Sequence, residues 1–331
     1  MKSLYRLGER VRTNQPIPFP IAGVLEAATV AFRIGMWLRL RQPQVRADAH
    51  VISLGNITVG GTGKTPAVID RVRTEMAAGK KVAVLTRGYR SKRTGPPIAL
   101  DTRVQDRNAC RILGDEPALI ARKVPGVIIV KCVDRVAAAR TAVTQFKCDT
   151  LILDDGFQHV RLARDENILV VDATNPFGNG HLVPRGILRE PVTAAQRATA
   201  VLLTRCDQAR DAKSLIARLE ALCPGVPIRK TRHVPHMLWR VADGASLPLS
   251  DIRGREVRAV CAIGRPEAFF TTLESLGATI TERLTFPDHS AIPASALSAS
   301  GLVVTTEKDA VCLKEVPANV LAVCIELEDY E

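Results

Sequence analysis

The sequence contains few aromatic residues, no closely spaced cysteine pair and no long uncharged apolar segment. Phe, Trp and Tyr make up 4% of the 331 residues, which argues against the base-stacking surfaces that bind single-stranded nucleic acid. The eight cysteines include no Cys-x-x-Cys pair, which excludes a zinc ribbon or a dithiol motif. We therefore expect reduced, mostly buried thiols in a cytoplasmic protein. No uncharged apolar run reaches the ~18 residues of a membrane-spanning helix, so we expect no bilayer-spanning segment.

The composition is that of a soluble globular protein with an excess of positive charge. Apolar residues make up 46% and charged residues 24%, and the length suggests about two domains. The net charge of +12 implies an anionic partner, which can be a nucleic acid, an anionic lipid or a phosphorylated substrate. Residues 1–46 hold eight basic and two acidic residues, and therefore carry half of the net charge.

The N-terminal segment combines this charge with an apolar stretch over residues 21–40. Arg33 and Glu26 interrupt the stretch, which is unlike the apolar core of a secretory signal. Trp37 stands between Arg33 and Arg39, a combination suited to the headgroup boundary of a membrane. We predict an interfacial helix on an anionic membrane; a helix packed on its own domain remains the alternative.

From residue 49 onward, short apolar runs alternate with helical patterns. The predicted strands are 50–54, 82–86, 127–130, 150–153, 168–171 and 200–203, and the predicted helices are 65–78, 115–123, 134–146 and 211–222. Such buried runs indicate a doubly wound α/β domain with a mostly parallel sheet. A turn-rich stretch and a shorter βα series follow. We expect a membrane-interfacial helix in residues 1–47, a phosphate-loop domain in 48–232, a hairpin-like linker in 233–252 and a smaller α/β domain in 253–331.

The strongest motif is Gly55-Asn-Ile-Thr-Val-Gly-Gly-Thr-Gly-Lys-Thr-Pro66, between a predicted strand and a predicted helix. In a phosphate loop, backbone N–H groups converge on phosphate oxygens, a lysine neutralises charge and a hydroxyl binds Mg²⁺. Lys64 and Thr65 supply the last two, although Thr58 replaces the first glycine of the strict pattern. The predicted nucleotide-binding residues are Thr58, Val59, Gly60, Gly61, Thr62, Gly63, Lys64 and Thr65.

A second motif, Thr150-Leu-Ile-Leu-Asp-Asp-Gly156, ends a predicted strand with two carboxylates. In nucleoside triphosphatases such a strand brings an Asp beside the phosphate loop to hold Mg²⁺. Asp154 and Asp155 are therefore candidate metal ligands, with an acidic turn as the alternative.

Two other functions fit parts of the sequence. Thr204-Arg-Cys-Asp207 loosely resembles a guanine-reading loop, which would suit a GTP-using regulatory protein. The net charge would suit a nucleic-acid-dependent ATPase, although the aromatic content is low. Protein-kinase signatures are absent from the sequence.

The sequence resembles the tetraacyldisaccharide 4′-kinases, the lipid A 4′-kinases. The family carries the phosphate loop Gly-Asn-x-x-Val-Gly-Gly-x-Gly-Lys-Thr and the segment Leu-Asp-Asp-Gly-Phe-Gln, which stands here at 153–158. Further segments that look alike are Thr86-Arg-Gly-Tyr-Arg90, Gly114-Asp-Glu-Pro117, Gly178-Asn-Gly180, Pro184-Arg-Gly-Ile-Leu-Arg-Glu190, Phe286-Pro-Asp-His289 and Thr306-Glu-Lys-Asp309.

The resemblance implies transfer of the ATP γ-phosphate to the 4′-hydroxyl of an anionic tetraacyldisaccharide 1-phosphate lipid, with Mg²⁺ as cofactor. It also implies a peripheral enzyme on the cytoplasmic side of the inner membrane, without a nucleic-acid partner. The implied catalytic residues are Lys64, the base Asp115 and its helper His289. Asp115 could equally cap the N-terminus of a helix.

The resemblance also implies supporting roles for an ionic pair and a basic loop. Arg189 could contact phosphate charge, and Glu190 could join Thr65, Asp154 and Asp155 around the metal. The alternative for Arg189 and Glu190 is a surface ion pair. Arg87 and Arg90 lie past a strand end, where α/β sites open. They could contact the substrate 1-phosphate or the nucleotide, or belong to a solvated loop.

Overall fold

The computed structural model describes residues 18–88, 95–103, 109–298, 300–314 and 316–331, together with residues 8, 10, 11 and 15. The strands of the first half are β1 (His50–Gly55), β2 (Val82–Thr86), β3 (Ile98–Asp101), β4 (Ile128–Lys131), β5 (Thr150–Asp154), β6 (Glu166–Asp172) and β7 (Ala200–Thr204). The later strands are β8 (Ile228–Arg240), β9 (Ser246–Leu247), β10 (Glu256–Cys261), β11 (Thr279–Thr285), β12 (Leu302–Thr306) and β13 (Val320–Asp329).

The helices alternate with these strands. They are α2 (Phe19–Leu40), α3 (Lys64–Ala77), α4 (Ala109–Leu113), α5 (Asp115–Lys123), α6 (Arg135–Phe146), α7 (Ala212–Leu222), α8 (Pro266–Ser275), α9 (Ala294–Leu297) and α10 (Glu307–Ala310). Short 3₁₀ turns are η1 (Val192–Arg197), η2 (Cys206–Gln208) and η3 (Leu249–Ile252). The strands and helices expected from the sequence are present, with ends that differ by a few residues. The short edge strand β3 was not predicted.

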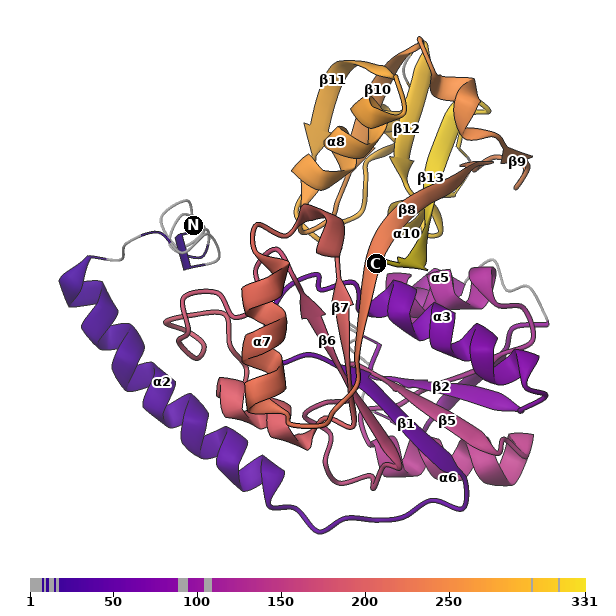
Figure 1. Ribbon diagram of the computed structural model, residues 1–331. Helices are drawn as coiled ribbons and strands as arrows, with labels where there is room; N and C mark the ends of the chain where they lie inside the picture. Colours follow the sequence, from indigo (N-terminus) through magenta and orange to yellow (C-terminus); the bar gives the residue numbers. More distant parts are fainter. Residues whose placement is uncertain are drawn as a thin grey trace.

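The strands form one sheet in the order β11-β10-β12-β13-β8-β7-β6-β1-β5-β2-β4-β3, with β9 paired to β8 (Figure 1). From β7 to β4 the neighbouring strands are parallel, and β3 is an antiparallel edge. Leu54 of β1 pairs with Asp154 of β5. The carboxyl ends of these two strands therefore meet, and a parallel sheet presents its ligand site at that edge.

The long strand β8 connects the two series of strands. It pairs in parallel with β7 and antiparallel with β13, and β9 folds back on it as the expected hairpin, with Leu238 opposite Leu247. The boundary expected at residue 232 therefore falls inside one continuous strand. The division of the chain into domains stays a prediction.

Both faces of the first series are covered by helices, which is why its strands are apolar on both sides. On one face, Val68 and Val72 of α3 and Ile120 of α5 pack on the strands. On the other face, Ala138 and Ala142 of α6 lie against β2, β4 and β5, and α7 covers the β6–β7 end. The loops that follow β1, β5 and β2 are thereby held on a rigid base.

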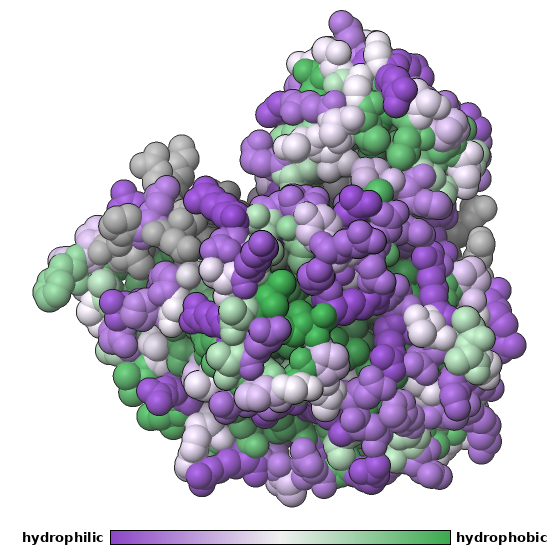
Figure 2. Space-filling view, viewed as in Figure 1, coloured by the Kyte–Doolittle hydropathy of each residue, from purple (hydrophilic) through white to green (hydrophobic). Residues whose placement is uncertain are grey.

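Helix α2 lies along one side of the molecule with most of its surface exposed (Figure 1). Its exposed apolar residues are Phe19, Ile21, Val24, Val30, Ile34, Trp37 and Leu38. Green apolar and purple polar residues alternate along this side in Figure 2. By length and composition alone, α2 could cross a membrane. This differs from the expectation of no membrane-spanning segment. That expectation counted only uncharged runs, and two charges, Glu26 and Arg33, interrupt an otherwise apolar segment.

Candidate active site

The phosphate loop connects β1 to the first turn of α3. Gly63 is the N-cap of α3 with φ of 82°, and a Cβ atom there would lie 2.8 Å from Cε1 of His233, so both backbone conformation and space require glycine. Buried Asn56 donates to the hydroxyl oxygens of Thr58 and Thr62 at 3.2 and 3.0 Å. Asn56 thus holds together the loop in which Thr58 replaces the usual glycine.

Lys64 is held at the mouth of this loop by two oxygen atoms. Its Nζ lies 3.3 Å from Asn56 Oδ1 and 3.5 Å from Asp155 Oδ1. Asp155 has a φ of 53°, and its second oxygen accepts a hydrogen bond from Arg189 at 2.8 Å. Burial would raise the pKa of Asp155, but Lys64 and Arg189 hold it below its usual range. The predicted residues Lys64, Asp155 and Arg189 therefore meet in one cluster.

Asp154 occupies a different environment from its neighbour. It is buried, and its Oδ2 accepts a hydrogen bond from the Thr86 hydroxyl at 3.3 Å. Burial, together with the charges of Glu116 and Asp155, raises the pKa of Asp154 to about 7. An adjacent pair of carboxylates with pKa values displaced in opposite directions is a feature of functional sites.

Glu190 is buried and lies behind the phosphate loop. Arg197 contacts its two oxygens at 2.8 and 2.7 Å, and Gln158 donates to one of them at 2.9 Å. Gln158 also donates to the carbonyl oxygen of Asn56 at 2.9 Å. Glu190 thus anchors the segment that carries Arg189; its expected role as a metal ligand stays a prediction.

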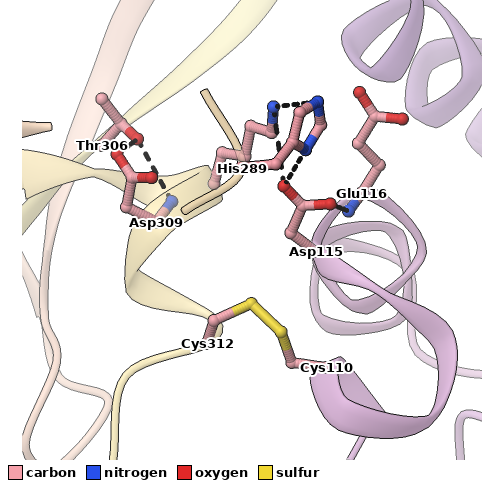
Figure 3. Close-up of a disulfide and its surroundings, with 8 residues drawn as sticks. Cys110, Asp115, Glu116, His289, Thr306, Asp309 and Cys312 are labelled. Atoms are coloured by element: carbon pink, nitrogen blue, oxygen red, sulfur yellow. Dashed lines mark hydrogen bonds and ion pairs between the residues drawn. A yellow bond between two sulfur atoms is a disulfide. The ribbon is translucent and has the colours of Figure 1, made fainter. Parts of the chain in front are cut away.

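A second cluster contains Asp115 and His289, which come from α5 and from the loop after β11 (Figure 3). His289 Nδ1 lies 2.6 Å from Asp115 Oδ2, and Lys308 Nζ lies 3.5 Å from the same oxygen. Burial raises the pKa of Asp115, but His289 and Lys308 lower it overall. Burial lowers the pKa of His289, but the hydrogen bond with Asp115 raises it above its ordinary value. The N-cap of α5 is Gly114 rather than Asp115.

Glu116 connects the two clusters electrostatically. Its charge acts on Asp154 beside the phosphate loop and also on Lys308 of the second cluster. The second cluster borders a cavity of about 500 Å³, which Asp115, His289 and Lys308 line together with residues 290–292 and the segment after α10. None of the described residues of the phosphate loop lines this cavity, so the charge of Glu116 is the observed link between the two clusters.

A basic cavity of about 620 Å³ lies between the end of α2 and the sheet. It is lined by Arg39, Arg87, Arg135, Arg161 and His159, among others. Burial, followed by the charges of Arg135 and Arg39, lowers the pKa of His159 to about 3. Arg87 therefore faces a cationic cavity, as a phosphate contact would require. Arg90, also predicted, lies outside the described residues.

The loop that loosely resembled a guanine reader supports the phosphate loop instead. Arg205 donates to Asp172 at 2.6 Å and to the carbonyl oxygen of Gly61 at 3.1 Å. The hydroxyl of Thr204 donates to the carbonyl oxygen of Thr62 at 2.9 Å. Arg205, which stands where a guanine-reading loop has its lysine, thus contacts other residues of the protein.

The expectation of reduced cysteines is wrong for one pair. Cys110 of α4 and Cys312, just past α10, form a disulfide beside the second cluster (Figure 3). The two cysteines are 202 residues apart, so their proximity depends on the sheet topology and no local spacing reveals it. The other six cysteines are buried and free.

The roles of several site residues were not foreseen from the sequence. They are Asn56, Thr86, Gln158, Arg197 and Lys308. All except Arg197 stand within the segments that carry the family resemblance, and that position was the available signal. Their partners could not be assigned because each contact joins separate segments of the chain.

Comparisons with known proteins identify the family of the chain. Residues 19–329 match the family model described as tetraacyldisaccharide-1-P 4′-kinase, LpxK. The tetraacyldisaccharide 4′-kinase of Anaeromyxobacter sp. (strain K) is 42% identical over 311 residues, which cover 89% of this chain and 81% of that protein. The tetraacyldisaccharide 4′-kinase of Pelobacter propionicus is 36% identical, with 97% and 90% covered.

A solved structure is similar over nearly the whole chain. It is LpxK from Aquifex aeolicus in complex with ATP, with a TM-score of 0.76, 28% identity and coverage of 94% of this chain and 95% of that one. The fold class and the family resemblance predicted from the sequence are both confirmed. The chain belongs to the tetraacyldisaccharide-1-P 4′-kinase family.

Proposed function

We propose that this protein transfers the γ-phosphate of ATP to the 4′-hydroxyl of a tetraacyldisaccharide 1-phosphate, which gives the 4′-phosphorylated precursor of lipid A. Family membership supports the reaction, and one observation supports the division of labour: the 2.6 Å contact between Asp115 and His289, in a cluster separate from the phosphate loop. A phosphoryl transfer needs a cradle for the phosphates and an acceptor for the hydroxyl proton. The two clusters supply one each.

The phosphate side of the reaction belongs to residues 58–65. Backbone N–H groups at the start of α3 point toward an anion there, with the positive end of the helix dipole behind them. Lys64 exchanges its contact with Asp155 for the phosphate oxygens when ATP binds. Arg189, which is paired with Asp155, provides a second cation at the same position.

The oxygen atoms near Lys64 fit a magnesium ion. Asp155 Oδ1 is buried and accepts no hydrogen bond from the described residues, and Asp154 ends the strand beside the loop. In the part of the chain that the structure describes, no group of three or more His, Cys, Asp or Glu side chains could hold a metal. Mg²⁺ commonly takes only one or two protein carboxylates plus phosphate oxygens. We assign Thr65, Asp154 and Asp155 to it; when bound, it neutralises developing charge on the phosphates.

Asp115 is the proton acceptor in this proposal. Its Oδ2 already accepts from His289 and lies near Lys308, whereas Oδ1 accepts one hydrogen bond, from the N–H of Glu116. Oδ1 therefore has a lone pair left for the acceptor hydroxyl. The lowered pKa of Asp115 makes it a weak base, which suits a loose transition state in which the proton leaves late.

The lipid acceptor accounts for the basic cavity and α2. Arg39 and Arg87 line the cavity, which can hold an anionic headgroup, and α2 exposes apolar side chains beside it. We infer that α2 docks at the surface of an anionic membrane, where acyl chains of the substrate are accessible. Because ATP is the donor, the active site faces the cytoplasm, and the enzyme is peripheral on that side of the inner membrane.

The direct test is incubation with γ-labelled ATP and a tetraacyldisaccharide 1-phosphate dispersed in detergent. Label should appear on the lipid, at the 4′ position, and should depend on Mg²⁺. Hydrolysis that prefers GTP and ignores the lipid would favour a regulatory nucleotidase, and hydrolysis stimulated by DNA or RNA would favour a nucleic-acid-dependent enzyme.

A further inference from the structure

The ammonium group of Lys308 lies among three acceptors from two separate segments. Its Nζ is 3.5 Å from Asp115 Oδ2, 3.4 Å from His289 Nε2 and 3.2 Å from Asp288 Oδ1. The Lys308 side chain is 21% exposed. A lysine ammonium has three N–H donors and no acceptor, so its capacity matches these three neighbours.

Ala262, the residue just after β10, holds this arrangement in place. The backbone N–H of Ala262 donates to Asp309 Oδ2 at 3.1 Å, and its carbonyl oxygen accepts from the N–H of His289 at 3.1 Å. Thr306 caps α10 by accepting from the N–H of Asp309. Lys308 and His289 are therefore fixed relative to each other through Ala262, while Asp115 approaches them from α5.

The partners of His289 determine which ring nitrogen carries its proton. Nδ1 faces the Asp115 carboxylate at 2.6 Å, and because a carboxylate only accepts, Nδ1 must carry hydrogen. Nε2 faces Lys308 at 3.4 Å, and because an ammonium only donates, this contact favours a lone pair on Nε2. Asp288 Oδ1 is farther from Nε2, at 3.7 Å.

We propose that Lys308 is a positioning residue for the phosphoryl transfer: it opposes protonation of the His289 ring, which keeps the Nδ1–H directed at Asp115, and it keeps Asp115 ionised as the proton acceptor. This inference rests on the proposed role of Asp115. The charged groups around Asp115 are Glu116 on α5, Asp288 and His289 in the loop after β11, and Lys308 and Asp309 on α10. Lys308 is the permanent cation of this set.

Removal of the charge by Lys308→Met gives a defined kinetic signature. An opposite charge within 4–6 Å lowers a carboxyl pKa by about 1–3 units, and protonation of His289 replaces part of the lost charge. The acid limb of kcat/KM should therefore move upward by about one pH unit. At neutral pH Asp115 stays ionised, so kcat should fall there only through the loss of His289 orientation, by less than the ~10²–10⁴-fold of a general base, with little change in KM for ATP. The ionisation of ATP affects the wild-type and variant enzymes equally, so it does not contribute to the difference between their pH profiles.

Two variants separate charge from geometry. Lys308→Arg keeps the cation, so it should retain the wild-type acid limb even where its larger planar group lowers kcat. Lys80→Met removes an exposed charge beyond the far end of α3 and should leave both parameters unchanged. A Lys308→Met profile identical to wild type would overturn the inference. If Asp115→Asn is also fully active, the proposed base itself is wrong; if Asp115→Asn is inactive, only the role of Lys308 is lost.

A measurement on the unmodified protein covers the case in which Lys308→Met does not fold. The ring of ¹⁵N-labelled His289, assigned by comparison with His289→Gln, should show the neutral form protonated at Nδ1. A ring protonated at Nε2 in its neutral form would contradict the geometry that the proposal requires.

Discussion

The Nδ1 atom of His289 lies 2.6 Å from Oδ2 of Asp115, although 174 residues separate them in the sequence. The contact exists because β8 extends the phosphate-loop sheet into the second series of strands, which places the loop after β11 near the start of α5. The Asp115 carboxylate at the start of α5 thereby gains a donor that orients it. The first prediction follows from this contact.

Replacement of Asp115 by Asn should lower kcat by ~10²–10⁴-fold, the usual contribution of a general base, and should leave ATP affinity nearly unchanged. The amide cannot take the hydroxyl proton, but it is close in size. His289→Ala should lose less, because it removes only the orienting group. The double variant should lose less than the product of the single losses, because residues that act as a unit are not additive. Steady-state kinetics and ATP titration measure both quantities.

The competing interpretation of Asp115, as a residue that merely stabilises the start of α5, gives another result. An Asn side-chain oxygen can accept the same hydrogen bond from the N–H of Glu116, so folding and turnover would both be preserved. A folded Asp115→Asn enzyme that keeps more than about a tenth of wild-type kcat, well short of the general-base effect, would move the base to another carboxylate, with Asp155 first.

Lys64→Ala should abolish lipid phosphorylation without unfolding the protein. Among the described residues, the ammonium group of Lys64 contacts Asn56 and Asp155, and in the variant Arg189 can still pair with Asp155. The loss should reach at least ~10²–10³-fold, the effect of removing one preorganised donor from a transition state. Lipid phosphorylation and circular dichroism test it together; near-normal turnover in a folded variant would remove Lys64 from the mechanism.

The buried carboxyl of Asp154 predicts how stability changes with pH in the absence of metal. Its pKa is raised to about 7 by burial, whereas an unfolded chain has an Asp pKa of about 3.9. Between these values the folded state binds more protons, so stability falls as pH rises from about 4 to 7. Asp154→Asn should lose this slope and be more stable than wild type at pH 8. Urea unfolding with a chelator at pH 5 and pH 8 measures the difference; parallel pH profiles would contradict it.

Contiguous features of the site could be predicted from the sequence, whereas its long-range contacts could not. Lys64 and Thr65 belong to one motif of twelve consecutive residues, and the residue types in that motif predict phosphate binding. Periodicity likewise predicts α5 to the residue, because its apolar face is a local pattern. The pairing of Lys308 with Asp115 depends on sheet order, and no periodicity encodes sheet order.

The continuity of β8 was hidden for a related reason. Its first three residues, 228–230, pair with β7, residues 231–240 pair with β13, and Leu238 and Trp239 also pair with β9. The burial pattern therefore changes along the strand, and a single alternation never develops. The disulfide between Cys110 and Cys312 could not be predicted from local sequence either, because it links the two series of strands.

That disulfide should be detectable by counting thiols. Unfolded protein without reductant should show six reactive thiols, the free cysteines of the structure, and eight after reduction, the number in the sequence. Reduction should lower the free energy of unfolding by about 2–4 kcal/mol, because the bond limits the unfolded chain. Cys110→Ser should show the same loss, and reductant should then have no further effect. Eight reactive thiols in unreduced protein would contradict the bond.

The last prediction concerns α2. Serine in place of Phe19, Val24 and Val30 should weaken binding to anionic vesicles by at least ~10²-fold, since full burial of each such side chain contributes ~1.5–3 kcal/mol. All three are exposed and lie outside the set that lines the basic cavity, so phosphorylation of acceptor dispersed in detergent should be retained.

Salt should weaken wild-type binding as well, because each basic residue near an anionic surface contributes ~1 kcal/mol. Deletion of residues 1–40 should remove both effects. A helix that lies on the membrane is released by an alkaline carbonate wash, whereas one that spans it is not. Vesicle binding unchanged by the deletion would mean that α2 serves only to pack against its own chain.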